Sequence, residues 1–422
     1  MLRCRIKLLF MFTCILALSP ATTYSESIKI EFDSIEKFVK EQNLHAQGAK
    51  FIHKSAEAKR GHLKRSYLPR VSARIGQEAY QTGSQESRNE TVASVDLAVN
   101  LYRGGRDTLE DKITDANANI AKLESAQTVR FEIEKAREAY WNLVAQREAK
   151  TLLESASSGN NKQVRSAKER VDAGLATRTD IYEFEMYQVR LEQEQARNSL
   201  EIKKRELELA VLLGFSANVT IETLTKVNHV HNDGLLSEPF NPETHPSVVT
   251  LYKQGQGAKI EAKKADLWWA PSVDLYASHG LNAYREREFE EQDERVESVV
   301  GAQATFGLFD GFDSRTESKQ KRYEARGRLA ESKQTARELM AQVENARNEL
   351  KVAHEIIHTS EKSLGIAKTY LQETLEEYKR GVKNSPDVLS ALEKNLELQL
   401  KFIELKLGYQ QSRTQLLQLL GR

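Results

Sequence analysis

Two short stretches of the chain, Leu101-Tyr102-Arg103-Gly104 and Leu308-Phe309-Asp310-Gly311, are similar and stand at matching places in a repeat. They lie 207 positions apart (308 minus 101). Three more pairs keep that offset: Gly174 with Gly381, Asp180 with Asp387, and Leu212-Leu213-Gly214 with Leu419-Leu420-Gly421. Such a period is far too long for a solenoid. The sequence therefore predicts an ancient duplication of a whole structural half.

Both predicted halves have the same internal order of elements. A helical segment comes first, at about Leu44–Ser66 and at about Ser247–Trp268, and a proline that ends helical geometry follows it, Pro69 or Pro271. Two strands, a long helix, a turn and a return helix complete each half. The predicted units are the first repeat at 26–214, a linker at 215–244 and the second repeat at 245–422.

Apolar and polar residues alternate after both prolines, which predicts two strands in each half. The apolar positions are Val71, Ala73, Ile75 and Ala79, then Ala93, Val95, Leu97, Val99 and Leu101, and in the second half Val273, Leu275 and Ala277, then Val300, Ala302, Ala304, Phe306 and Leu308. Period-two segments of about ten residues are typical of barrels that face lipid outside and water inside. The alternative is two soluble hairpins packed on a domain core, and the strand pattern alone does not separate the two. Aromatic residues stand at the strand ends, as at membrane interfaces: Tyr67, Tyr102, Trp268, Trp269 and Phe309.

The long proline-free segment from Arg106 to about Asp172 predicts one helix of roughly 67 residues, or about 100 Å. We interpret its polar stretch Ser155–Asn161 as a weakened turn within that helix. A turn at Gly174 or Gly381 follows in each half, and then a return helix of about 36 residues that ends at a glycine. The return helix and the short first helix together match the long helix in length. We therefore expect two short helices end to end beside one long helix, twice per chain.

The second return helix has two apolar seams, which indicates neighbours on both sides, as in the wall of a helical cylinder. One seam consists of Leu389, Leu392, Leu396, Leu400, Ile403 and Leu407, and the other of Leu398, Phe402, Leu405 and Tyr409. The alternative is an ordinary bundle helix with one broad apolar face.

The first 25 residues have the layout of a secretory signal: Arg3, Arg5 and Lys7, an apolar stretch too short to span a bilayer, and then small residues. Cleavage after Ala21 or Ser25 fits equally well. The alternative, a lipoprotein signal at Cys14, has a poor preceding sequence. Both cysteines, Cys4 and Cys14, lie in this segment, so we expect no disulfide in the mature chain.

Composition argues against several classes of function. The 62 basic and 61 acidic residues nearly balance, so no basic surface for nucleic acid is expected. The chain has no phosphate-binding loop and no Gly-x-Ser-x-Gly motif, and we predict no enzyme and no cofactor. We interpret the grouping of His229, His231, Asp233 and His245 as a solvated linker rather than a metal site.

Four strands per chain are too few to close a membrane barrel, since the smallest known barrels have eight. An open strand edge in lipid leaves backbone groups unpaired at several kcal/mol each. If the strands lie in a membrane, several copies must share them, and three copies would give twelve strands. A membrane barrel of these strands therefore requires an oligomer, and the strand count alone does not set the number of copies at three.

The whole predicted mature chain resembles the TolC-type outer-membrane efflux proteins. The resemblance rests on the duplication, the strand-end motifs, the segment Ala139-Tyr140-Trp141-Asn142-Leu143, and the paired turn motifs from Gly174 to Asp180 and from Gly381 to Asp387. It implies a mainly α fold with a transmembrane β-barrel: a homotrimer with a twelve-strand barrel in outer-membrane lipid and a long periplasmic α-helical barrel of coiled-coil helices. It also implies two partners, a periplasmic adaptor (membrane fusion) protein and an inner-membrane transporter.

The resemblance also implies roles for particular residues. The turns form a periplasmic tip that is closed at rest, Asp387 belongs to an acidic ring at the entrance, and other positions hold neighbouring helix pairs together or make the turns: Asp180, Tyr378, Lys383, Gly174 and Gly381. The expected barrel–helix junction is Pro69, Pro271, Gly104 and Gly311. Ser390 and Lys383 depart from members that have a second acid and an arginine there, which removes a bidentate contact. The alternative is that Asp180 and Asp387 are simply helix N-caps.

These observations predict an exit duct in the outer membrane, part of a tripartite efflux or type I secretion system that opens at its tip on docking. The alternatives are a non-transporting periplasmic coiled-coil protein, which the strand pairs disfavour, and a secreted enzyme, for which no catalytic constellation is present.

Overall fold

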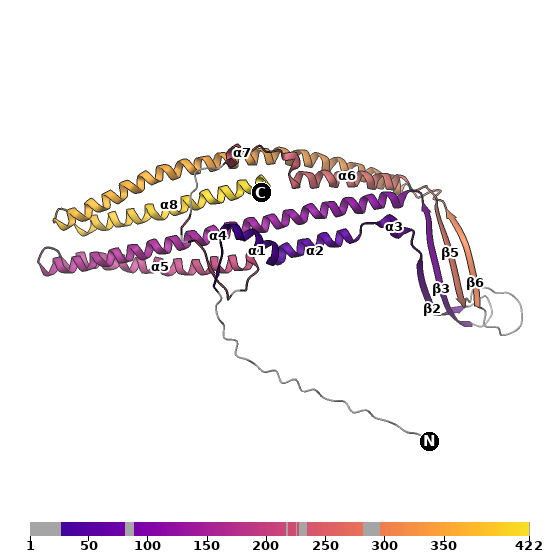
Figure 1. Cartoon of the computed structure of the whole chain (residues 1–422), viewed down its shortest axis with the longest axis horizontal. Helices are drawn as coiled ribbons and strands as arrows, with labels where there is room; N and C mark the ends of the chain where they lie inside the picture. The colour runs from indigo at the N-terminus through magenta and orange to yellow at the C-terminus, as the bar shows by residue number, and fades with distance from the viewer. Residues whose placement is uncertain are drawn as a thin grey trace, which may run out of the picture.

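The molecule is elongated and mainly helical, with a small sheet at one end of the long helices (Figure 1). A computed structural model describes residues 27–80, 88–216, 218–224, 226–227, 234–281 and 296–421. The predicted signal segment and the linker residues His229, His231 and Asp233 lie outside these ranges. No helix in the described ranges is both long enough and apolar enough to cross a membrane.

The first half follows the predicted order, with extra short elements at its start. Its elements are β1 (Ser27–Lys29), η1 (Phe32–Ser34), α1 (Ile35–Gln42), α2 (Leu44–Ala58), α3 (His62–Ser66), β2 (Arg70–Tyr80), β3 (Arg88–Arg103), α4 (Arg106–Asp172), α5 (Arg178–Leu213) and β4 (Thr220–Glu222). The helix expected over Leu44–Ser66 is broken, because Gly61 adopts a left-handed conformation with φ 73° between α2 and α3.

The second half repeats the main elements in the same order. They are η2 (Gly234–Ser237), η3 (Pro242–Thr244), α6 (Pro246–Asp266), β5 (Ser272–Leu281), β6 (Val296–Thr305), α7 (Asp313–Lys379) and α8 (Ser385–Leu419). Both long helices, α4 and α7, contain 67 residues. The prediction of two matched long helices is confirmed.

The polar segment Ser155–Asn161 lies within α4 and does not interrupt it, as expected. Asn160 is fully buried and donates from Nδ2 to the carbonyl of Phe184 at 2.9 Å and to Oε1 of Gln188 at 3.2 Å. Gln188 in turn donates to Oγ of Ser157 at 2.8 Å. Residues with weak helix propensity therefore serve here as polar contacts between α4 and α5.

In the first half, α2 and α5 both pack along α4, as the matched lengths predict. At their junction Asn43 caps the start of α2, accepting from the amide of Ala46, and donates to the carbonyl of Leu212 near the end of α5 at 2.8 Å. Gly214 approaches the backbone of Gln42 so closely that a Cβ would lie 2.5 Å from the carbonyl oxygen. This contact explains why a glycine follows α5.

The helices form one curved layer. α4 packs against α2 and α5 on one side and against α6 and α8 on the other, and α7 packs against α6 and α8. The layer therefore begins with α2 and α5 and ends with α7. The two predicted seams of α8 are confirmed: Phe402, Leu405 and Tyr409 join a core with α7, whereas Leu396, Ile403 and Leu407 join cores with α4 and α5.

A four-stranded antiparallel sheet, in the order β2-β3-β5-β6, stands at the end of the helix layer (Figure 1). Val95, Leu97 and Leu101 of β3 are exposed, while Ser94 and Asn100 on the opposite face are buried. On that polar face Ser278 donates to Asp96 at 2.6 Å across the β3–β5 pair. The alternation has the predicted sense, with an apolar face on one side and a polar face on the other.

A second, two-stranded sheet joins the first described residues to the linker, and no sequence pattern predicted it. β1 pairs in parallel with β4, with Ile28 opposite Ile221. Ile221 and Ile30 are buried in the largest hydrophobic core, which also contains Tyr140 and Trp141 of α4. The segment predicted only as a linker therefore packs against the middle of the long helix.

Candidate functional site

The candidate site has two parts. The tip is the pair of turns that join α4 to α5 and α7 to α8, residues 173–177 and 380–384. The junction is the set of residues where strands meet helices, Pro69, Gly104, Pro271 and Gly311. Figure 1 shows them at opposite ends of the long helices.

Equivalent glycines and capping boxes build both turns of the tip. Gly174 and Gly381 have φ values of 72° and 78°, which other residues rarely adopt. In the first turn Thr177 is the N-cap of α5, and its amide donates to the Asp180 carboxylate at 2.8 Å. In the second, Asn384 is the N-cap of α8 and its side chain accepts from the amide of Asp387 at 3.2 Å.

The alternative interpretation that Asp180 and Asp387 are N-cap residues is wrong in position. Both stand three residues inside the helix, where the carboxylate of a capping box accepts from the N-cap amide. The physical role is closely related, because each carboxylate still lies at the positive end of a helix.

Ser385 links the two helical hairpins, α4–α5 and α7–α8, at the tip. Its hydroxyl is almost fully buried and contacts the carboxylates of both Asp180 and Glu183, the latter at 2.5 Å. Burial opposes ionisation of Asp180, but hydrogen bonds from Ser385 and Thr177 outweigh it and hold the pKa of this carboxyl below its ordinary value. Asp180 is therefore a charged acceptor shared by its own capping box and the opposite hairpin.

Arg170 forms a second link across the tip. Its Nη1 donates to the carbonyl of Tyr378 at 2.6 Å and to that of Lys379 at 3.3 Å, and its guanidinium lies 4.5 Å from the centre of the Tyr378 ring. Tyr378 is buried against Phe184, with ring centres 6.1 Å apart. Burial raises the pKa of the Tyr378 phenol, although Arg170 opposes the shift.

The structure brings only some of the expected tip residues together. Asp180 and Tyr378 take part in the contacts between the hairpins. Within the described chain Lys383 forms no ion pair with Asp180, and the Asp387 carboxylate contacts only its own N-cap. Sequence reasoning missed Arg170, Glu183 and Ser385, although the capping-box spacing Thr177-x-x-Asp180 was visible.

At the junction each proline stands immediately before a strand, Pro69 before β2 and Pro271 before β5. Gly104 and Gly311 both have positive φ, 62° and 67°. A Cβ on Gly104 would lie 2.3 Å from the Cβ of Ala270, whereas one on Gly311 would meet nothing within 4 Å. Both positions therefore favour glycine because of their left-handed backbone conformation, but only Gly104 is also required by close packing.

The residue after each glycine is the N-cap of the long helix and is also left-handed. In the first half it is Gly105, with φ 76°, and in the second it is Phe312, with φ 68°. A left-handed conformation costs an ordinary L-residue about 1–2 kcal/mol. Among the described residues Phe312 is the one non-glycine residue with positive φ.

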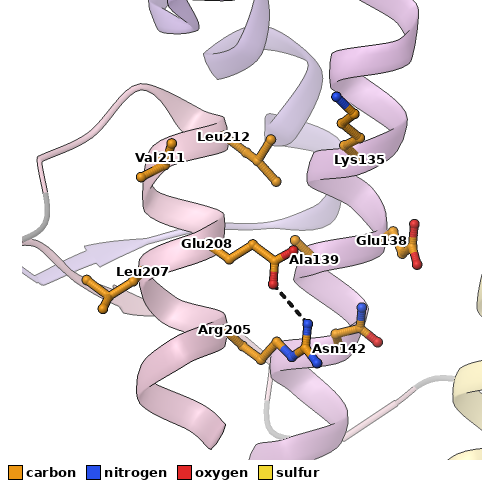
Figure 2. Close-up of a pocket in the computed structure, with 9 residues that line it drawn as sticks. All are labelled: Lys135, Glu138, Ala139, Asn142, Arg205, Leu207, Glu208, Val211 and Leu212. Carbon is orange, nitrogen blue, oxygen red and sulfur yellow. Dashed lines mark hydrogen bonds and ion pairs between the residues drawn. The ribbon is translucent and has the colours of Figure 1, made fainter.

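A shallow hollow of about 610 Å³ lies beside α4 and α5 near the middle of the molecule (Figure 2). Figure 2 shows Leu207 on the side of α5 away from α4, and both Leu207 and Val211 are exposed. Charged residues, among them Lys135, Glu138 and Arg205, surround the apolar part. Nearby on α4, burial and the adjacent Glu138 raise the pKa of Glu134 to about 7.

Within the described residues no group of three or more His, Cys, Asp or Glu side chains is placed to hold a metal.

A family model described as outer membrane efflux protein matches residues 245–422. This match covers the whole of the second half, and the first half repeats its fold. The resemblance to TolC-type outer-membrane efflux proteins is thus confirmed. The second half is similar in sequence to this family of outer-membrane proteins. No curated protein sequence matches the chain.

Several solved structures share the fold over nearly the whole chain. The CmeC outer membrane channel of Campylobacter jejuni has 13% identity and a TM-score of 0.77, with 92% of this chain and 85% of that chain covered. The outer membrane protein VceC of Vibrio cholerae has 15% identity and a TM-score of 0.75, with 92% and 96% covered. The open state of the MtrE outer membrane channel of Neisseria gonorrhoeae has 13% identity and a TM-score of 0.73, with 92% and 88% covered. The predicted mainly α fold is therefore confirmed, and these outer-membrane channels share it.

Proposed function

We propose that the chain is one subunit of a homotrimeric exit duct, in which three copies share a twelve-strand barrel in the outer membrane and a periplasmic tube of helices. The observation that carries this proposal is the alignment of two open edges. β2 and β6 are the outer strands of the sheet. β2 directly follows α3, on the side of the helix layer where α2 lies, and β6 directly precedes α7, the outer helix on the other side. Head-to-tail contact between unlike edges generates a ring when the rotation closes.

Both helical edges carry apolar side chains that have no cover in the single chain. On α2 and α5 these are Leu44, Phe51, Ile52, Tyr182, Met186, Val189, Leu200, Leu207 and Val211, and on α7 they are Tyr323, Met340, Val352, Ile356, Ile366 and Tyr370. Several recur at helical spacing, as Tyr182, Met186 and Val189 do. Exposed apolar rows of this length mark protein contacts, and the neighbouring copy supplies complementary ones.

The sheet supports the same assembly. Backbone groups on β2 and β6 that lack a partner in one chain would cost several kcal/mol each in lipid, so a further strand must pair with each edge. The polar face with Asp96, Asn100 and Ser278 would line the water-filled interior. The exposed apolar face would contact lipid.

For the tip we propose the role of a periplasmic gate. The contacts of Ser385 and Arg170 between hairpins would hold the entrance narrow, and Asp387 would face the axis. Opening would follow when the tip docks a periplasmic adaptor protein and an inner-membrane transporter. The duct itself would be passive, serving efflux or type I secretion, with selectivity set by the transporter.

Disulfide trapping tests the assembly. Val189 on α5 and Tyr370 on α7 are exposed and lie at similar distances from the tip, and Cys4 and Cys14 are the only cysteines. The double variant V189C/Y370C, oxidised in outer membranes, should give covalent dimers and trimers and nothing larger. The single variants should give neither. Monomers alone from the double variant would contradict the proposed ring.

Planar-bilayer conductance tests the gate. Asp180→Asn with Asp387→Asn should raise ion leakage through the purified channel, because Asp180 loses its charged contact with the opposite hairpin and the entrance loses carboxylates. Glu373→Gln, an exposed change in α7 near the tip, is the matched control. Conductance equal to that of the control would remove both aspartates from the gate.

A further inference from the structure

The two halves of the chain are equivalent in detail, so contacts within one copy indicate the contacts between copies. The pairing of β2 with β3, with Arg70 opposite Ala98, recurs between β5 and β6 as Ser272 opposite Thr305. α4 and α7 have the same length, and the capping boxes of the two turns stand 207 positions apart. In a closed ring of such halves, each half would meet the next in the same way, whether that next half belongs to its own chain or to another copy.

The contact between the two helical hairpins at the tip can be transferred in this way. Within one chain, Ser385 near the start of α8 donates to the carboxylate of Asp180 on α5. The residue equivalent to Ser385 in the first half is Arg178 (385 minus 207), and the residue equivalent to Asp180 in the second half is Asp387. The equivalent contact between copies therefore joins Arg178 of one copy to Asp387 of its neighbour.

The residue types on both sides of this contact are complementary. Within the chain, the neutral hydroxyl of Ser385 lies between two carboxylates, those of Asp180 and Glu183. At the equivalent place between copies, the donor is a guanidinium, and Ser390 replaces Glu183, so one carboxylate remains. One carboxylate balances the charge of one arginine, and the two groups can form a pair of parallel hydrogen bonds.

Both side chains are available for the contact. Arg178 is exposed on α5, at one edge of the helix layer, and its guanidinium forms no hydrogen bond or ion pair with the described residues. The carboxylate of Asp387 is half-buried and contacts only the amide of its own N-cap, Asn384. α5 and α8 meet directly within the chain, so α8 can also meet the α5 of the next copy, although α7 is the outer helix.

The equivalence does not create ion pairs indiscriminately. A second contact between α5 and α8, the ion pair of Arg190 with Glu393, lies further from the tip. Its counterparts between copies are Glu397 and Met186, which cannot form an ion pair. The arginine at 178 therefore matches its predicted partner by residue type as well as by position.

We propose that Arg178 of each copy binds Asp387 of the neighbouring copy and latches the copies together at the periplasmic tip. This latch rests on the proposed ring of three copies and adds a specific contact between them. The entrance would then carry carboxylates alternating with guanidinium groups rather than carboxylates alone. Opening of the tip would have to break three such pairs.

Disulfide trapping tests the position of the latch. Arg178→Cys combined with Asp387→Cys, oxidised in outer membranes, should give covalent trimers. Neither single variant can give more than dimers, because one cysteine per chain links at most two copies. A disulfide that leaves the chain monomeric would show that the two residues meet within one copy, and it would overturn the proposal.

The variant V189C/Y370C on the long helices separates the latch from the ring itself. Trimers from V189C/Y370C together with monomers from R178C/D387C would overturn the latch and leave the ring standing. Monomers from both double variants would contradict the ring as well as the latch.

Charge exchange tests whether the contact is an ion pair. Arg178→Glu and Asp387→Arg each bring like charges together, so each should raise ion leakage in planar bilayers several-fold. The double variant restores opposite charges in all three contacts and should return leakage close to that of the unsubstituted channel. Lys162→Glu, an exposed charge reversal on α4, is the control and should leave leakage unchanged. Leakage in the double variant equal to or above that of the single variants would overturn the proposal.

Discussion

The guanidinium of Arg170 on α4 holds the backbone carbonyl of Tyr378 at the end of α7, with a 2.6 Å hydrogen bond and its charge stacked over the tyrosine ring. A cation thus sits at the negative end of the second long helix, where the carbonyl groups lack intrahelical partners. This contact joins residues 208 positions apart and connects the two hairpins near their ends.

Replacing Arg170 should loosen the tip. Arg170→Ala removes a charge-assisted hydrogen bond and the stacking, at an expected cost of about 2 kcal/mol, or roughly 30-fold in local opening. Hydrogen exchange measured by mass spectrometry should accelerate across Tyr378–Val382. Arg165→Ala is the control, because the Arg165 side chain is exposed and bonds only to Asn161 of its own helix. Equal acceleration in both variants would contradict a specific role for Arg170.

The two junction glycines, Gly104 and Gly311, should differ in how well they tolerate substitution by alanine. Gly311→Ala introduces only backbone strain, about 1–2 kcal/mol, because the space around it is open. Gly104→Ala adds a clash with Ala270 to the same strain and should lower the yield of folded channel much further. Yield and thermal midpoint of the purified protein measure the difference. The prediction fails if the two variants behave alike.

Replacing the buried Asn160 should destabilise the protein more than replacing its exposed neighbour Asn161. Asn160→Ala removes two hydrogen bonds between α4 and α5 and leaves Gln188 with one partner fewer, so a cost of about 1–2 kcal/mol is expected. Asn161→Ala, at an exposed position in the same segment, should change stability by less than about 0.5 kcal/mol. Exchange rates of α5 amides around Phe184 report the local effect. Comparable rates in both variants would rule out the polar contact as a stabilising one.

Glu134 should make stability depend on pH. Its pKa is raised from 4.5 to about 7, so the folded chain binds more protons than the unfolded chain between these values. Stability should accordingly fall as pH rises from about 4.5 to 7 and level off above, by at most about 3 kcal/mol before solvent screening is counted. Glu134→Gln should flatten this dependence in thermal unfolding, whereas Glu154→Gln, at an exposed ion pair with Lys150, should not. An unchanged pH profile in Glu134→Gln would refute the assignment.

The parts of the fold that sequence could predict are those set by local patterns. The α4 bounds follow from a proline-free segment between glycines, and the strands follow from period-two alternation. The β1–β4 pair and α1 were missed, because a three-residue strand has no periodicity and its partner lies almost 200 residues away. The break at Gly61 was missed because a glycine within a helical pattern is often tolerated.

The candidate site was less predictable, because its contacts join residues that lie far apart in the sequence. Turn glycines and aspartates stand in a repeated local motif, so sequence could find them. Arg170 and Ser385 act on residues of the other hairpin, and nothing local distinguishes them from the many arginines and serines on these helices. Which side chains meet across the tip depends on the register between two hairpins, and that register is a property of packing rather than of either sequence segment.

The unbroken course of α4 from Arg106 to Asp172 has a mechanical consequence. A rod of about 100 Å turns a small change of angle at one end into a large displacement at the other, almost 2 Å for each degree. Forces applied anywhere along the shaft would arrive at the far end as movement rather than being absorbed by a hinge. A few degrees of pivoting would be enough to dilate the aperture by the width of a water molecule on each side.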